Sequence, residues 1–168
     1  MIYYCGIDNG VSGQAAFLFS DGSYDAIDMP VKRELSYQKS KKVFIRRIDY
    51  DVLKLYFETM MAREPEGELR VIIERPMINS HLFTASLSAI RALESQMILL
   101  EHLGLSCQFI DSKKWQKELL PKGISGKELK KASMDVGIRL FPKCKSLGIK
   151  HKDLDGMLIA EYARRTVL

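Results

Sequence analysis

Four carboxylates at three places in the chain have the residue types and positions needed to bind a cation. Asp8 ends a strand-like apolar run near the N-terminus, and Glu74 ends another in the middle of the chain. Asp153 and Asp155 open an apolar, helix-like segment near the C-terminus. Acidic groups at the ends of buried strands are costly unless they are paired or coordinate a metal. The pattern therefore predicts a cage of oxygen ligands for divalent cations.

The chemistry of such a cage is that of metal-assisted hydrolysis. Mg²⁺ prefers nearly octahedral oxygen ligands and keeps several waters, so a few shared carboxylates are enough to hold it. Two such ions about 3.5–4 Å apart can activate an attacking water and stabilise the leaving 3′ oxygen of a displacement at phosphorus. We expect Asp8, Glu74, Asp153 and Asp155 to be both catalytic residues and metal ligands. His151 either binds metal, positions water, or is an ordinary surface histidine.

Each carboxylate also has a purely structural explanation. Asp8 precedes Asn9-Gly10 and can cap a turn. Glu74 can form an ion pair with Arg75 or with a neighbouring lysine. Asp153 can be the N-cap of the helix that follows it. The residues alone leave these alternatives open.

The charge distribution indicates a polyanionic partner. Residues 31–48 contain seven Lys/Arg and one acid, and residues 113–152 contain twelve Lys/Arg and three acids. The remainder carries seven bases and seventeen acids. Basic walls around an acidic centre fit nucleic acid held over a metal site, although two solvated lysine-rich loops would look the same. The expected DNA contacts are Lys41, Lys42, Arg46, Arg47, Arg75, Lys113, Lys114, Lys117, Lys130 and Lys131.

The hydrophobic pattern predicts an α/β fold in one domain over residues 1–168. Strands are expected at 2–7, 14–20, 24–29, 69–74 and 105–110, and helices at about 49–63, 80–104, 113–120, 126–140 and 154–167. A meander followed by crossovers gives a five-stranded mixed sheet, three antiparallel strands and then parallel strands, with helices on both faces. Residues 31–48 are expected to form a long basic loop or irregular insertion.

Two local expectations follow from this topology. If the first strand and the 69–74 strand are parallel neighbours about 4.8 Å apart, Asp8 and Glu74 lie side by side at adjacent carboxyl ends. Asp49 or Asp51 can cap the first helix, and Ser80 the long one. The apolar residues of the long helix cover more than one stripe, so they either pack on the sheet and a partner subunit or belong to a deeply buried helix.

Composition places the chain among ordinary globular proteins. It has 168 residues, of which 46% are hydrophobic and 28% charged. We find no apolar stretch near the ~20 residues that cross a bilayer and no signal-peptide pattern, so no membrane association is expected. The three cysteines, Cys5, Cys107 and Cys144, form no metal-binding pair and are expected to be reduced thiols in a cytoplasm.

At these residues the chain resembles a known family. GIDNG near the N-terminus, VIIERP in the middle and HKDLDGMLIA near the C-terminus resemble the three acidic motifs of RuvC-type Holliday junction resolvases, which belong to the ribonuclease H-like superfamily. The length and the lysine-rich run from Ser112 to Lys131 are similar to the phage-encoded branch, as in lactococcal phages. The resemblance spans nearly the whole chain.

The resemblance implies a ribonuclease H-like homodimer in the cytoplasm of a bacterial host cell. It would bind four-way DNA junctions and cut two strands symmetrically with Mg²⁺ or Mn²⁺, that is, act as a crossover junction endodeoxyribonuclease. Asp8, Glu74 and Asp155 match the family's acidic positions. Many members have an acid or a histidine three positions before the last aspartate, where this chain has Lys152, so Asp153 or His151 is expected to take that role. Residues 80–103 match the dimerising region.

Three other functions are compatible with the same residues. A ribonuclease H-like nuclease can act on flaps, forks or RNA-containing duplexes instead of four-way junctions. GIDNG followed by FLFSDG also resembles the phosphate loop of actin-like ATPases and sugar kinases, although those proteins need a second domain. A junction-binding scaffold without activity would use the acids only as caps.

Overall fold

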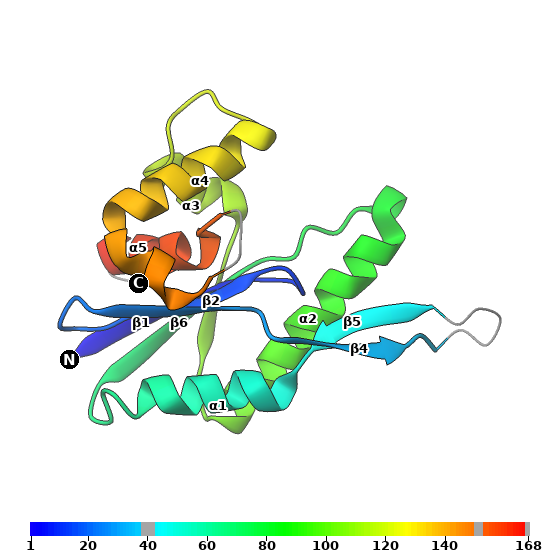
Figure 1. Cartoon of the computed structure of the whole chain (residues 1–168), viewed down its shortest axis with the longest axis horizontal. Coiled ribbons are helices and arrows are strands. Elements are labelled where there is room, and N and C mark those ends of the chain that lie inside the picture. Colours follow the sequence, from blue (N-terminus) through cyan, green and yellow to red (C-terminus); the bar gives the residue numbers. More distant parts are fainter. Residues whose placement is uncertain (38–42, 150–152, 167–168) are drawn as a thin grey trace.

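A five-stranded mixed sheet forms the centre of the molecule in the order β3-β2-β1-β6-β7. The computed structural model describes residues 1–37, 43–149 and 153–166 (Figure 1). The strands are β1 (Ile2–Asp8), β2 (Gln14–Leu18), β3 (Tyr24–Asp28), β6 (Glu68–Glu74) and β7 (Cys107–Ile110). Strands β1, β2 and β3 pair antiparallel, while β6 is parallel to both β1 and β7. The predicted mixed α/β sheet is therefore confirmed.

Helices cover both faces of this sheet (Figure 1). The helices α1 (Tyr50–Met61) and α2 (Phe83–His102) cover one face, and α3 (Ser112–Leu119), α4 (Lys127–Leu140) and α5 (Asp155–Thr166) cover the other. Side chains alternate along a strand, so β1 supplies both cores. Tyr3, Cys5 and Ile7 pack with α1 and α2, whereas Tyr4 packs with α3, α4 and α5.

The closest contact between a helix and the sheet is made by α5 on β1. A Cβ on Gly6 would lie 2.3 Å from both the backbone nitrogen of Ala160 and the backbone oxygen of Gly156. Only glycine allows this approach, because any Cβ at position 6 would clash with backbone atoms, which cannot move aside as a flexible side chain can. Strand β1, which carries Asp8, and the start of α5, which carries Asp155, are thus held in a fixed relation.

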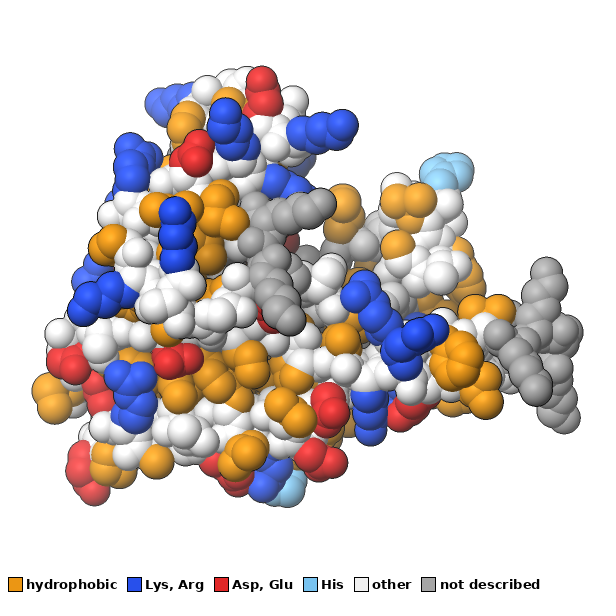
Figure 2. All heavy atoms as spheres, viewed as in Figure 1, with side chains coloured by type: hydrophobic (Ala, Val, Ile, Leu, Met, Phe, Trp, Pro, Cys, Tyr) orange, Lys and Arg blue, Asp and Glu red, His pale blue; other side chains and the backbone are white. Residues whose placement is uncertain are grey.

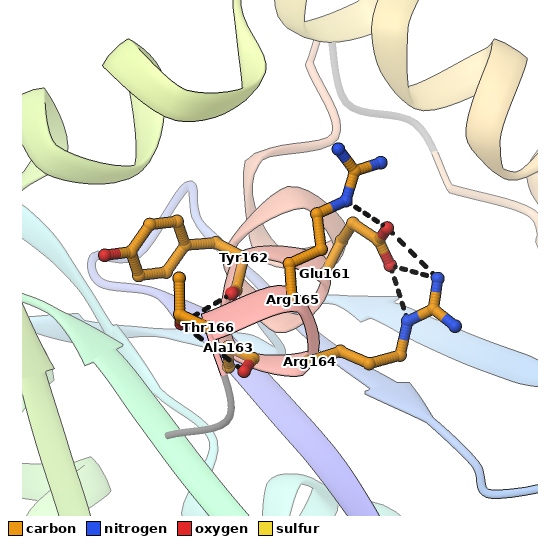
Figure 3. A network of polar contacts seen from close by, with 6 residues as sticks. All are labelled: Glu161, Tyr162, Ala163, Arg164, Arg165 and Thr166. Atoms are coloured by element: carbon orange, nitrogen blue, oxygen red, sulfur yellow. Dashed lines mark hydrogen bonds and ion pairs between the residues drawn. The ribbon is translucent and has the colours of Figure 1, made fainter.

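The other end of α5 carries an ion network in which a buried glutamate binds two half-exposed arginines (Figure 3). Glu161 is 1% exposed and accepts hydrogen bonds from Arg164 at 2.8 Å and from Arg165 at 2.7 Å. Burial opposes ionisation, but these bonds outweigh it and lower the pKa of Glu161 below its usual value. The carboxylate is therefore charged, and it orders two arginines at the C-terminal turn of the helix.

The prediction that residues 31–48 form a loop is wrong. Strands β4 (Val31–Leu35) and β5 (Phe44–Ile48) pair antiparallel in a separate two-stranded sheet that projects from the main one beside α2 (Figure 1). Cross-strand side-chain pairs stabilise it: Arg47 donates to Glu34 at 2.7 Å, and the guanidinium of Arg33 lies 4.9 Å from the ring centroid of Phe44. Because this hairpin is largely exposed, its strands carry the charged composition that is typical of a loop.

Two predicted helix starts have different outcomes. Asp49 caps α1 as expected, since its side chain accepts a hydrogen bond from the backbone of Val52. Ser80 does not cap the long helix. It begins a 3-10 turn (Ser80–Leu82) that is capped by Asn79, whose side chain accepts a hydrogen bond from the backbone N–H of His81. Helix α2 begins after that turn. A second 3-10 segment, Pro142–Leu147, follows α4.

Two expectations from composition can be compared with the structure. All three cysteines are free thiols, and Cys5 and Cys144 are buried. In the described part of the chain, every helix is too short or too polar to span a bilayer.

Candidate metal centre

Asp8 and Glu74 lie at adjacent ends of two parallel strands, as the topology predicted. Ile7 of β1 is the register partner of Ile73 of β6, and each carboxylate residue comes next in its strand. Gly13 makes room beside Asp8: a Cβ there would lie 2.0 Å from the carbonyl oxygen of Asp8. The chain can therefore turn back tightly into β2 directly behind the first acid.

Three carboxylates converge at this edge of the sheet. Asp8, Asp153 and Asp155 each offer an oxygen, and these atoms all lie within 4.8 Å of one another. Helix α5 begins at Asp155, so Leu154 and not Asp153 directly precedes its first residue. The carboxylate of Asp153 instead forms an ion pair with Lys130 of α4 at 3.7 Å. Asp153 thus joins the acidic cluster and leaves the cap position to its neighbour.

Glu74 is held beside the cluster by an indole. Nε1 of Trp115, a fully buried residue of α3, donates a hydrogen bond to Oε2 of Glu74 at 2.6 Å. The pKa of Glu74 is raised to about 7. Burial is the largest cause, the indole hydrogen bond opposes the rise, and the charges of Asp155 and Asp153 contribute to it. Glu74 is therefore electrostatically coupled to the cluster, although its oxygens lie outside the set that meets within 4.8 Å.

The cluster accumulates negative charge in a buried place. Burial raises the pKa of Asp8 well above its usual value, and the charges of Asp155, Glu74 and Asp153 raise it further. Lys130 acts in the opposite direction. Such a group of acids is unfavourable when ionised unless cations neutralise it. The donor set, all carboxylate oxygen, fits hard divalent ions such as Mg²⁺.

Three polar residues that sequence reasoning did not assign support the cluster. Ser133 of α4 donates a hydrogen bond to Asp155 and accepts one from the backbone of Leu154 at 3.3 Å. The buried side chain of Gln14 accepts from the backbone of Met157 at 3.3 Å, and Trp115 donates to Glu74 as described. The only sequence signal among them is Trp115, the single tryptophan of the chain, inside a basic helix.

The expected DNA contacts are distributed over several surfaces. Exposed lysines line α3 and α4, namely Lys113, Lys114, Lys117, Lys130 and Lys131. Arg75 follows β6, is exposed, and pairs with Asp111 at 3.3 Å. Arg46 and Arg47 lie on β5, and Figure 2 shows Lys and Arg side chains gathered where that hairpin leaves the body. Lys41, Lys42 and His151 lie outside the described residues.

The sheet order, the helices on both faces and the acids at the strand ends define the ribonuclease H-like fold. Among the solved structures that superpose on this chain are two of RuvC. The solved structure of T. thermophilus RuvC in complex with a Holliday junction substrate superposes with a TM-score of 0.59 at 12% identity, covering 99% of this chain and 95% of that one. A second T. thermophilus RuvC structure gives 0.50 at 13% identity, covering 99% and 97%. Neither a family model nor a curated protein sequence matches the chain.

Proposed function

We propose that the protein is a metal-dependent, structure-selective DNA endonuclease that resolves Holliday junctions and other branched DNA. The observation that carries this proposal is the meeting of three carboxylates within 4.8 Å, with Glu74 beside them, at the strand ends of a ribonuclease H-like sheet. T. thermophilus RuvC, which has the same fold, was solved on a Holliday junction substrate. The chain length and the lysine-rich run from Ser112 to Lys131 favour a phage-encoded enzyme that acts in a bacterial host cell.

The chain supplies the ligands and the groups that fix them. Asp8, Asp153, Asp155 and Glu74 would hold divalent cations, Mg²⁺ or Mn²⁺, which when bound activate water and stabilise the leaving 3′ oxygen. Glu74 is oriented by the indole of Trp115. Asp155 is fixed by Ser133, so two of the four acids are positioned before any cation arrives.

Basic side chains around the cluster would bind the DNA backbone. Lys130 lies 3.7 Å from Asp153, so its ammonium group is close enough to contact a phosphate that is being cut. The exposed lysines of α3 and α4, together with Arg75, extend this positive surface. Phosphate contacts carry little sequence information, so we expect selectivity to come mainly from the shape of the junction.

The proposed enzyme is a homodimer, because two symmetric cuts need two sites. An exposed apolar strip runs from the segment before α2 along that helix. Its members are Met77, Ile78, Leu82, Phe83, Leu87 and Ile90. Phe83 alone is 71% exposed, and a monomer rarely leaves a contiguous strip of this kind in water. The resemblance of residues 80–103 to the dimerising region of the family favours a second copy as its partner.

The substitution Glu74→Gln tests the proposed activity. The amide keeps the shape of the side chain and an oxygen that can accept from Trp115, but it removes the ligand charge. We expect unchanged binding to a four-way junction without metal and no detectable cleavage with Mg²⁺. Wild-type rates on four-way, fork, flap and RNA-hybrid substrates would separate junction resolution from the alternative nuclease activities. Full cleavage by the variant would disprove the catalytic assignment.

A further inference from the structure

A pocket of about 220 Å³ lies between the projecting hairpin and α2. Its walls include Arg46 and Arg47 from β5, Ser88 and Arg91 from α2, and Val11 from the turn after β1. Three arginines thus line one small space. Glu94 also lines the pocket, and Glu34 engages Arg47 at 2.7 Å, so Arg46 and Arg91 are the arginines with charge to offer a ligand.

Arg91 has an unused donor. Its Nε is shielded from solvent and has no hydrogen-bond partner among the residues that the structure describes. A buried donor without an acceptor costs free energy, and in native proteins such a group usually has a partner, water or an ion. A guanidinium group matches the oxygens of a phosphate with two parallel hydrogen bonds. The pocket therefore has the chemistry of an oxyanion site.

One residue of the pocket wall is close in sequence to the candidate metal centre. Val11 is three residues beyond Asp8, a path of at most about 10 Å. The side chain of Asn9 donates to the backbone oxygen of Ala89 at 3.2 Å, which joins this turn to α2 two residues before Arg91. A DNA strand that leaves the metal centre over this turn would therefore reach the pocket within a few nucleotides.

We propose that this pocket is a subsite for a backbone phosphate a few nucleotides from the cleaved bond, with Arg91 as its main ligand and Arg46 at its rim. The inference rests on the proposed function, because a nucleic-acid strand must first lie on the metal centre. It differs from general attraction to basic surfaces, since one phosphate position pairs with one arginine.

A double-substitution cycle tests this pairing. Methylphosphonate groups, which lack the phosphate charge, are placed one at a time on both sides of the crossover in a four-way junction, and metal-free dissociation constants are measured for wild type and Arg91→Gln. We expect Arg91→Gln to weaken binding of the unmodified junction roughly tenfold and to reduce the log–log salt slope by about one. At one position the methylphosphonate should weaken junction binding by the wild type about as much as Arg91→Gln does. At that same position it should cause no further loss of binding by the Arg91→Gln variant.

Matched variants separate the pairing from other causes. Lys54→Gln removes one positive charge on α1 and should change neither the affinity nor the salt slope. Arg91→Lys keeps the charge without the planar fork, so it should keep the slope and lose part of the affinity. Arg46→Gln probes the pocket from its exposed rim, where folding is not at stake.

Two results would overturn the subsite. One is that the Arg91 and methylphosphonate penalties add independently at every position, which would leave water as the partner of Nε. The other is that Lys54→Gln weakens binding as much as Arg91→Gln does. A wild-type protein that shows the coupled position but cleaves no branched DNA would refute the proposed nuclease and leave the subsite standing.

Discussion

At the scale of single residues, the acids depend on the groups behind them. Trp115 is fully buried, and its indole nitrogen makes a 2.6 Å hydrogen bond to Glu74. Trp115→Phe keeps an aromatic ring in the core and removes this donor. We expect the Mg²⁺ concentration for half-maximal cleavage to rise about 10–100-fold, as is usual when a partner of a metal ligand is lost. Tyr56→Phe, which removes a hydroxyl donor to Asp25 on the opposite face of the sheet, is the control and should leave the Mg²⁺ requirement unchanged.

The protonation of Glu74 gives a second prediction at this scale. Its pKa in the folded protein is about 7, above the ordinary value of 4.5, and that of Asp8 is also raised. Between pH 4.5 and about 7, Glu74 is more fully protonated in the folded metal-free protein than in the unfolded chain. Its contribution to stability therefore decreases as the pH rises. We expect the melting temperature to fall less steeply between pH 5 and 8 in Glu74→Gln than in wild type. Parallel slopes for the two proteins in thermal melts would contradict the raised pKa.

At the scale of elements, the contact of α5 with β1 links folding to the site. A methyl group on Gly6 meets backbone at 2.3 Å. One on Gly67, which precedes β6 at the end opposite Glu74, meets the ring of Tyr3 at 2.9 Å. Gly6→Ala should therefore cost about 1–3 kcal/mol of unfolding free energy, measured in urea, and should abolish cleavage because Asp155 moves away from Asp8. Gly67→Ala should retain cleavage. Equal losses of cleavage in both variants would mean that α5 does not set the site.

At the scale of the whole molecule, the apolar strip on α2 predicts the assembly. Phe83→Asp places a charge where a partner would bury an aromatic ring, and Val52→Asp, at an exposed position of α1, is the matched control. Sedimentation should show a dimer for wild type and Val52→Asp, and a monomer for Phe83→Asp. The monomer should nick junctions without paired cuts. A dimeric Phe83→Asp would place the interface elsewhere.

The main sheet and the positions of Asp8 and Glu74 could be predicted from the sequence, because local and periodic patterns of apolar residues mark them. Asp8 and Glu74 end apolar runs, and two parallel strands necessarily bring such ends together. The hairpin was missed because its strands are exposed and so lack a buried face to mark them. The contacts of Trp115 and Ser133 join segments 41 and 22 residues apart in the chain, and no local pattern encodes such a contact.

The hairpin has a consequence for how such a protein can change. Within the described residues, β4 and β5 pair with each other and with no strand of the main sheet. The backbone N–H of Asp49 donates to the carbonyl oxygen of Pro30 at 2.8 Å, which closes the base of the hairpin. An insertion whose two ends already meet can be shortened, lengthened or exchanged without repacking either core. If the protein has the proposed function, the shape of DNA that it accepts could therefore diverge between relatives, or be engineered, while the candidate metal-binding carboxylates stay in place.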